Sequence, residues 1–163
     1  MKIYCDILSN DELLADSLPI IPILDSCGYE VASEKISVGD DFDIGTANAS
    51  DNPDAEKVIN LVNMFAYTEV SFNKADYTTY LKAYVQKIKA YLEENKPDRV
   101  EAFLKESEEM EEWILKNFDN FQFWVGKSKN TTDAMIILSY YKSSEDAAPH
   151  FVYFADGLNV IVV

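Results

Sequence analysis

Residues 74–118 read KADYTTYLKAYVQKIKAYLEENKPDRVEAFLKESEEMEEWILKNF and are the most strongly patterned stretch of the chain. Up to Leu92 the apolar residues are spaced three and four apart, which draws a broad stripe along one face of a helix. Pro97 and Asp98 then suit the first turn of a second helix, because proline needs no amide partner there and an acidic residue favours the positive end of the helix dipole. A break of only three residues between the two helices therefore predicts an antiparallel helical hairpin over about 74–118.

The segments on either side of the hairpin are predicted to form strands. Residues 2–8 alternate polar and apolar side chains, 29–36 fit another short strand, and one or two strands are expected in 58–72. Pro19 and Pro22 argue against a regular helix in the apolar run 18–24. After the helices, strand formers gather in 120–125, 135–141, 151–154 and 158–163, and Asp156-Gly157 predicts a tight β-hairpin between the last two. The chain is expected to be an α+β protein whose helical hairpin interrupts an antiparallel sheet in sequence.

Residues 39–56 combine six acidic side chains with Gly, Ala, Asn and Pro, and they show little apolar periodicity. This composition predicts a long, mobile acidic loop. Asp41, Asp43 and Gly45 faintly resemble a calcium loop, but Asn52 stands where an EF-hand needs a bidentate Glu, so no EF-hand is expected. No repeat and no linker divides the 163 residues, which are predicted to form one domain, 1–163.

The balance of charge excludes several classes of partner. Lysine and arginine number 14 against 29 acidic residues, a net charge of −15 that repels phosphate backbones and anionic lipid surfaces. No apolar run approaches the ~18 residues of a membrane span, and residues 1–8 lack the basic flank and apolar centre of a secretory signal. We expect a cytoplasmic protein that binds no nucleic acid and spans no membrane.

The residues that would carry catalysis are sparse. The chain has two cysteines, Cys5 and Cys27, and one histidine, His150, so a structural zinc site cannot be assembled. The two thiols are expected to be buried as small hydrophobic side chains, with a Cys5–Cys27 disulfide as the alternative. His150 has no partner motif around it and is expected to begin a strand with one hydrogen bond, and no Gly-rich nucleotide cradle occurs. We expect a protein that is not an enzyme and requires no cofactor.

The two helices of the hairpin differ in charge. Residues 74–97 carry a net charge of +2 and residues 98–118 a net charge of −4. Lys82, Lys89 and Lys96 recur every seven residues and therefore share one flank of the apolar stripe. Two interpretations of this row of lysines stay open: the lysines contact an acidic partner, or they form a solvated edge of the helix.

Five ordered segments of the chain resemble the translationally controlled tumour protein family (TCTP, also called histamine-releasing factor). The family's opening pattern is matched by Tyr4, Asp6, Ser9, Asp11 and Glu12. The other four segments are 44–50 (IGTANAS), 93–100 (EENKPDRV), 117–126 (NFDNFQFWVG) and 154–158 (FADGL). The resemblance implies a twisted antiparallel β-tent with a protruding helical hairpin. This β-tent fold is related in shape to zinc-binding Rab chaperones and methionine sulfoxide reductases, whose cysteines this chain lacks.

The resemblance also implies what the protein does. Members of the family are described as regulators of nucleotide exchange on Rheb-type small GTPases, and as partners of translation elongation factors that support growth and restrain apoptosis. Glu12, with Asp11 beside it, matches the position implicated in GTPase binding. The alternative implied function is weak calcium binding, at Asn48 and Gln122, together with tubulin binding by the hairpin, where Lys82, Lys89 and Lys96 would contact the acidic partner.

This chain also departs from the family pattern. Phe42 stands at a position where better-known members carry a phosphorylated serine, so that phosphoregulation is not expected here. Lys127 replaces the Glu that usually follows the second signature. Family members are also exported without a leader peptide, which the resemblance allows for this chain.

Overall fold

The computed structural model describes residues 1–24, 27–37 and 57–163. The predicted acidic loop, 39–56, and Asn48 with it, lie outside the described residues. The helices are α1 (Asn60–Phe65), α2 (Lys74–Asn95) and α3 (Val100–Lys116), with short 3-10 turns η2 (Pro97–Arg99), η3 (Phe118–Asn120) and η4 (Ala155–Gly157). The strands are β1 (Lys2–Asp6), β2 (Glu12–Ala15), β3 (Ile20–Ile23), β4 (Gly28–Ala32), β5 (Lys35–Ser37), β6 (Lys57–Ile59), β7 (Thr68–Val70), β8 (Gln122–Val125), β9 (Ile137–Tyr140), β10 (His150–Phe154) and β11 (Leu158–Val162).

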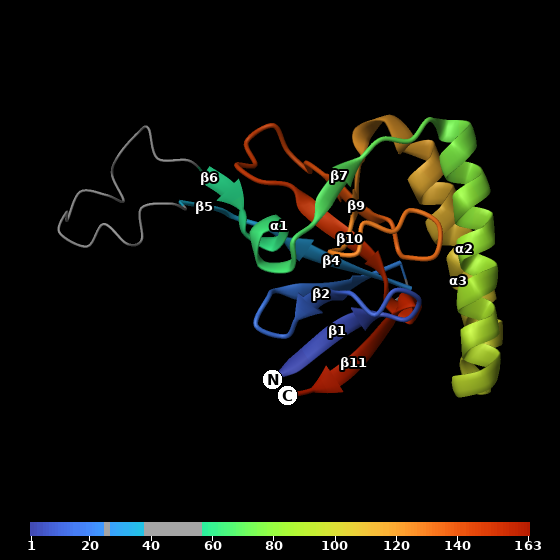
Figure 1. The fold of residues 1–163 in the computed structure, drawn as a ribbon. Coiled ribbons are helices and arrows are strands. Elements are labelled where there is room, and N and C mark those ends of the chain that lie inside the picture. Colours follow the sequence, from blue (N-terminus) through green and yellow to red (C-terminus); the bar gives the residue numbers. More distant parts are fainter. Residues whose placement is uncertain (25–26, 38–56) are drawn as a thin grey trace.

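The strands of the described residues form three antiparallel sheets. Their orders are β11-β1-β2, β3-β4-β10-β9-β8-β7 and β5-β6. The α+β class and the helical hairpin are confirmed, and Figure 1 shows α2 and α3 side by side at one flank of the sheets. The two chain ends lie together because β1 and β11 are paired, with Lys2 opposite Val162.

The predicted β-hairpin at Asp156-Gly157 is wrong. β10 pairs with β4 and β9, whereas β11 pairs with β1, so η4 is a corner between two sheets. Packing against α2, rather than the local turn signal, determines the path of the chain at Gly157. A Cβ at Gly157 would lie 2.2 Å from the hydroxyl oxygen of Tyr84 on α2, so the glycine allows the helix to approach the corner.

Two of the predicted strand regions also differ from the structure. Residues 58–72 hold two short strands, β6 and β7, but the six-residue helix α1 stands between them and ends at Ala66 in the left-handed conformation (φ 56°). Residues 29–36, expected as one strand, divide between β4 and β5, which belong to different sheets. The run 18–24 avoids a helix as predicted, and β3 carries Pro22 at the outer edge of its sheet, where a missing amide costs no ladder hydrogen bond.

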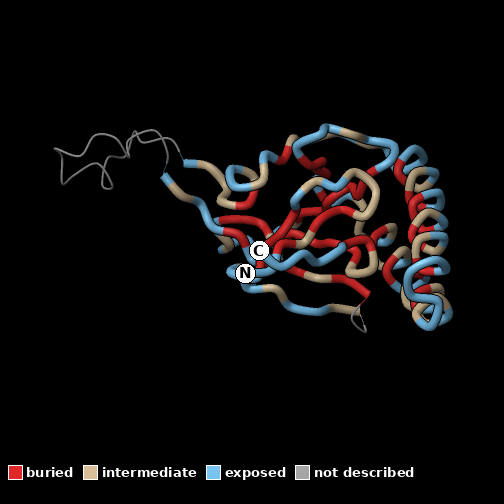
Figure 2. Tube along the Cα trace, turned by 60° about the horizontal axis from the view of Figure 1, so that its bottom comes forward, coloured by how far each residue is buried: buried red, intermediate tan, exposed pale blue. Residues whose placement is uncertain are grey.

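The core lies between the hairpin and the sheets. Tyr77, Leu81, Tyr84 and Ile88 of α2 are fully buried, and α3 adds Phe103, Met110 and Ile114. The ring centroids of Tyr77 and Phe123 are 4.9 Å apart and those of Tyr84 and Phe154 are 5.4 Å apart, so α2 packs on β8 and β10. Figure 2 shows the buried segments in the interior and exposed residues along the outer side of the hairpin.

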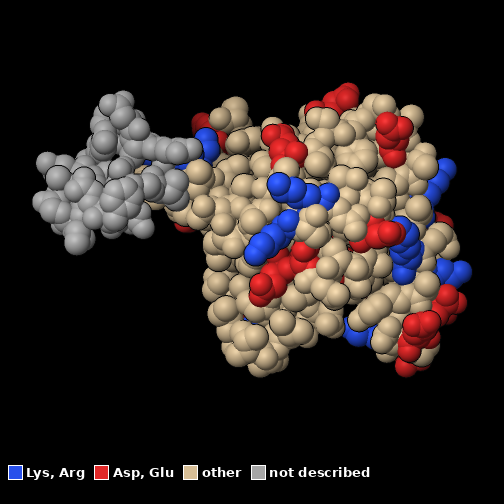
Figure 3. Space-filling view, viewed as in Figure 1, with Lys and Arg blue, Asp and Glu red and all other residues tan. Residues whose placement is uncertain are grey.

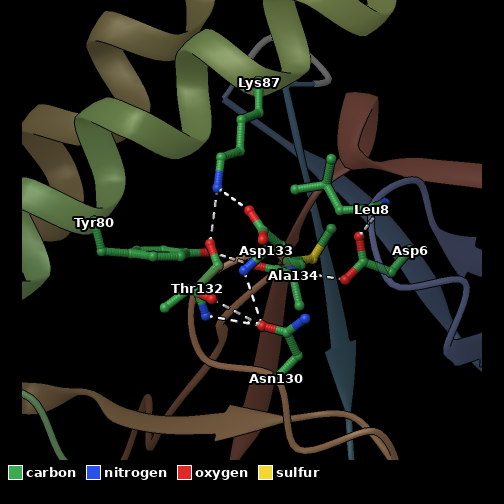
Figure 4. Close-up of polar contacts among 9 residues, drawn as sticks. Asp6, Leu8, Tyr80, Lys87, Asn130, Thr132, Asp133 and Ala134 are labelled. Atoms are coloured by element: carbon green, nitrogen blue, oxygen red, sulfur yellow. Dashed lines mark hydrogen bonds and ion pairs between the residues drawn. The ribbon is translucent and has the colours of Figure 1, made fainter.

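Polar contacts fasten α2 to the segment between β8 and β9 (Figure 4). The Tyr80 hydroxyl donates to the Ala134 carbonyl (2.6 Å) and accepts from the Ile136 amide (2.8 Å), so it satisfies two backbone groups just before β9. Lys87 forms an ion pair with Asp133 and donates to the Thr132 carbonyl (3.0 Å). These contacts hold the segment that also approaches the β1–β2 turn.

Candidate functional site

The turn between β1 and β2 carries Asp11 and Glu12 and is organised by the buried Asp6. The Asp6 carboxylate accepts hydrogen bonds from the Leu8 amide (2.9 Å), the Ser9 hydroxyl (3.0 Å) and the Met135 amide (2.7 Å). Burial raises the pKa of Asp6, while these donors act in the opposite direction. Asn10 takes a left-handed conformation (φ 65°), which asparagine tolerates, and directs the chain into β2.

Asp11 has a structural role in this turn. Its carboxylate accepts from the Ser128 hydroxyl (2.6 Å) and the Ser128 amide (3.2 Å), which ties the turn to the loop after β8. A Cβ at Gly126 would lie 2.7 Å from Asp11 Oδ2, so this glycine allows the approach. The Asp11 carboxylate is therefore engaged within the protein, and its predicted role in GTPase binding stays a prediction.

Glu12 has a different environment. It begins β2, is exposed, and makes no side-chain hydrogen bond or ion pair within the part of the chain that the structure describes. It shares a hollow of about 290 Å³ with its neighbours Asn10 and Asp11, with Lys127, and with Met64, Phe65 and Ala66 at the end of α1. Met64 is 51% exposed, so its apolar side chain is accessible beside Glu12. We call Asn10, Asp11, Glu12, Met64 and Lys127 the Glu12 surface.

Two members of the Glu12 surface were not found from the sequence as parts of a site. Met64 belongs to the stretch expected to be strand, where an apolar residue reads as core, and only the helical turn of α1 makes it face outward. Lys127 was noted only as a departure from the family pattern. No signal within the sequence links either residue to Glu12, because the β8–β9 loop and α1 meet the β1–β2 turn only in the folded chain.

The structure describes only one of the two predicted calcium residues. Gln122 is exposed at the start of β8, where its side-chain oxygen accepts a long hydrogen bond from Ser139 (3.4 Å). Asn48 is among the undescribed residues. Over 1–24, 27–37 and 57–163, no group of three or more His, Cys, Asp or Glu side chains is placed to hold a metal ion.

Lys82 and Lys89 lie on one flank of α2, whereas Lys96 is the non-helical residue that ends this helix, and the three differ in their surroundings. Lys82 is exposed and lines a groove between α2 and α3, where its charge counteracts the burial that raises the pKa of Glu111. Lys89 is half-buried, and Lys96 lies exposed at the end of α2 beside Arg99. On the face drawn in Figure 3, basic and acidic side chains lie interspersed rather than in one patch of a single sign.

The cysteines are buried and His150 begins a strand, as predicted, but the expected hydrogen bond of the His150 side chain is not found among the described residues. Cys5 and Cys27 are free and buried, and burial raises the pKa of Cys27 to about 12. His150 begins β10, where Nδ1 lies 3.5 Å from Glu30 and Nε2 lies 3.5 Å from Asp146. None of the described helices has the length and apolar character needed to cross a membrane.

Antiparallel sheets with a long helical hairpin on one flank, and a turn held by Asp6 and Asp11, define the β-tent class of α+β proteins. The chain belongs to the translationally controlled tumour protein family, whose family model matches residues 1–159. This family is generally known as non-enzymatic.

Individual relatives support the same assignment. The TCTP homologue of Plasmodium chabaudi chabaudi is 40% identical over 169 aligned positions, covering 97% of each chain, and homologue 1 of Dictyostelium discoideum is 35% identical over 99% of each. The solved structure of the Schizosaccharomyces pombe protein p23fyp matches with a TM-score of 0.82 at 34% identity and covers all of both chains. The Caenorhabditis elegans TCTP structure, at 20% identity and a TM-score of 0.70, shares the fold.

Proposed function

We propose that this protein is a non-catalytic regulator that binds a small GTPase of the Rheb type through the Glu12 surface. The observation that carries the proposal is an exposed carboxylate, Glu12, with no partner among the described residues, next to the exposed thioether of Met64. Methionine is enriched in protein interfaces because its flexible, polarisable side chain fits irregular apolar pockets.

The chemistry of the surface indicates how it would act. Asp11 and Asp6 hold the turn rigidly, so Glu12 is presented with little loss of freedom on binding. A carboxylate next to a GTPase switch segment competes for the cationic groups that hold the nucleotide phosphates and so favours an open switch. Such a surface accelerates release of the nucleotide without covalent chemistry.

The test is the release of fluorescent GDP from a Rheb-type GTPase. We expect acceleration by the wild-type protein and a loss of about tenfold or more in that effect with Glu12→Ala, as for a central interface residue. Glu69→Ala, which removes another exposed glutamate on β7 outside the surface, is the matched control and should accelerate release like the wild type. Equal acceleration by Glu12→Ala and the wild type would refute this role for Glu12.

The same surface is proposed to contact a translation elongation factor. The factor should then compete with the small GTPase for one binding site. Binding of both proteins at once, with no loss of affinity for either, would contradict a shared surface.

A second candidate function is tubulin binding by the helical hairpin, because Lys82 is exposed on α2 and Lys96 is exposed at the C-terminal end of this helix. Replacing Lys82, Lys89 and Lys96 by alanine should weaken binding to acidic tubulin and reduce its salt dependence. Lys105→Ala on α3, an exposed lysine outside the row, should have no such effect. Weak calcium binding at Asn48 and Gln122 belongs to this candidate, and titration of Asn48→Ala and Gln122→Ala variants with the ion alone tests it.

A further inference from the structure

A second surface feature, separate from the Glu12 surface, is a hollow of about 420 Å³ at the end of α3. Four aromatic side chains line it, Trp113, Phe121, Tyr140 and Tyr141, together with Asn117, Asn120 and Lys142. We call these residues the aromatic hollow. Its volume suits a small organic group, since ligand sites in proteins commonly enclose about 300–1,000 Å³.

Three of the rings are arranged as the walls of a corner. The ring centroids are 5.2 Å apart for Trp113 and Phe121, 5.8 Å for Trp113 and Tyr140, and 5.5 Å for Phe121 and Tyr140. The corresponding angles between ring planes are 73°, 81° and 70°. The three pairs are edge-to-face contacts, so the rings pack directly on one another. The negative ring faces that these contacts leave uncovered are the ones that can attract an organic cation.

The groups behind the rings add negative charge. The Tyr140 hydroxyl donates to the buried carboxylate of Glu30, which enriches the ring in electron density. Lys142 lines the hollow, but its ammonium is paired with the same Glu30 (2.5 Å). Asp146 adds a second carboxylate on the far side of His150, 3.5 Å from its Nε2. The group behind the rings therefore holds two carboxylates and one ammonium; the ammonium pairs with Glu30, and Asp146 accepts from the Lys142 and Ser143 amides.

The C-terminal end of α3 also favours a cation in the aromatic hollow. Asn117 caps the helix, and its side-chain amide donates to the Trp113 carbonyl (2.9 Å), so the amide oxygen is left to accept. The C-terminus of a helix carries partial negative charge, which favours a cation nearby. The net charge of −15 on the whole chain gives a further long-range attraction for positive ligands.

From the corner of rings, the paired ammonium and the helix end, we infer that the aromatic hollow binds an alkylammonium side chain of a partner, of the methylated-lysine type. Phe121, which is buried, forms the floor, Trp113 and Tyr140 form the walls, and the exposed Tyr141 lies at the rim. The amide oxygen of Asn117 is available to the peptide that carries the cation.

The experiment titrates the full-length protein with a peptide that contains one trimethyllysine, and it follows the two indole N–H signals by NMR. The Trp113 signal should shift with a saturable curve. The Trp124 signal should stay in place, because that indole donates to Ser139 inside the core (2.8 Å). The neutral peptide, in which carbon replaces the charged nitrogen, should bind at least about fivefold more weakly if the aromatic faces recognise charge.

Two variants test the residues. Trp113→Leu, followed by calorimetry, should weaken binding of the trimethyllysine peptide about tenfold or more, and Tyr141→Ala should weaken it without a change in the fold. Val160→Ala is the matched control, since it truncates an exposed apolar side chain on β11 that does not line the aromatic hollow. Equal affinity for the charged and the neutral peptide overturns the inference. So does saturable binding of a polyproline peptide at Trp113 with none of the trimethyllysine peptide.

Discussion

Tyr77 and Tyr80, one turn apart on α2, place their hydroxyl groups in opposite situations. The Tyr80 hydroxyl forms hydrogen bonds with two backbone groups, whereas the buried Tyr77 hydroxyl has no hydrogen-bond partner among the described residues. Tyr80→Phe should therefore lower the free energy of unfolding by about 1–3 kcal/mol, because it leaves a buried carbonyl and a buried amide without their hydrogen-bond partner. Tyr77→Phe should leave it unchanged or raise it by up to about 1 kcal/mol, and urea unfolding measures both. Equal losses in the two variants would show that the hydrogen bonds are not the cause.

Cys27 gives the protein a dependence on alkaline pH. Its pKa is raised from 9.0 to about 12, first by burial and then by the nearby Asp156 and Glu106 carboxylates. Between these two values the native thiol keeps its proton and the unfolded thiol loses it, so the free energy of unfolding falls as the pH rises from about 9 towards 12.

The measurement compares the wild type with Cys27→Ala over this pH range. The wild type should lose stability more steeply, by at most about 1.4 kcal/mol per pH unit, because the other titrating groups are common to both proteins. Parallel curves would mean that the thiol ionises equally in the folded and unfolded states.

At the scale of elements, Arg99 fastens the tip of the helical hairpin to the corner between the sheets. Its guanidinium donates to both oxygens of Asp156 (3.0 Å each) and to Glu106 (2.6 Å). Because the Arg99 side chain is 30% exposed, solvent reduces the contribution, and Arg99→Ala should cost only about 1 kcal/mol. Amide exchange should become faster in 96–100 and 155–157, while Lys105→Ala leaves it unchanged. Unaltered exchange in Arg99→Ala would indicate that apolar contacts alone hold the tip.

At this scale, the sequence-based predictions are correct where local interactions determine the structure and wrong where contacts between distant segments determine it. The hairpin over 74–118 was predicted because its stripe, its Pro97 and its short break are local properties. Asp156-Gly157 is also a local signal, but there the approach of Tyr84 and the bond to Arg99 set the path of the chain. α1 was missed because six residues are too few to show a period.

At the scale of the whole molecule, Tyr67 links separate sheets. Its hydroxyl donates to the Leu13 carbonyl on β2 and shares a hydrogen bond with the Tyr153 hydroxyl on β10 (2.7 Å). Tyr67→Phe should lower the stability by about 1–3 kcal/mol and preserve a single unfolding transition, since the apolar core is continuous across the sheets and the hairpin. Helical circular dichroism and tryptophan fluorescence should give one midpoint in urea. Two separate midpoints would show that the hairpin and the sheets unfold independently.

The residues of the candidate sites also divide into those that the sequence identifies and those that only the folded chain brings together. Glu12 was identified from the sequence through its motif, and the structure then separated it from Asp11, whose carboxylate is engaged by Ser128. Met64, Lys127 and the aromatic hollow could not be found, because each depends on segments that are distant along the chain and adjacent in the folded molecule.

The sequence by itself determined the α+β class, the helical hairpin, the burial of both cysteines and the family, because periodicity, composition and ordered motifs are properties of the chain. Only the tertiary structure decided which strands share a sheet, why Gly157 turns a corner, and which side chains Glu12 and Trp113 meet. The physical reason is that pairing and packing depend on contacts between distant segments, whose energies exceed the local preferences of a turn or a short apolar run.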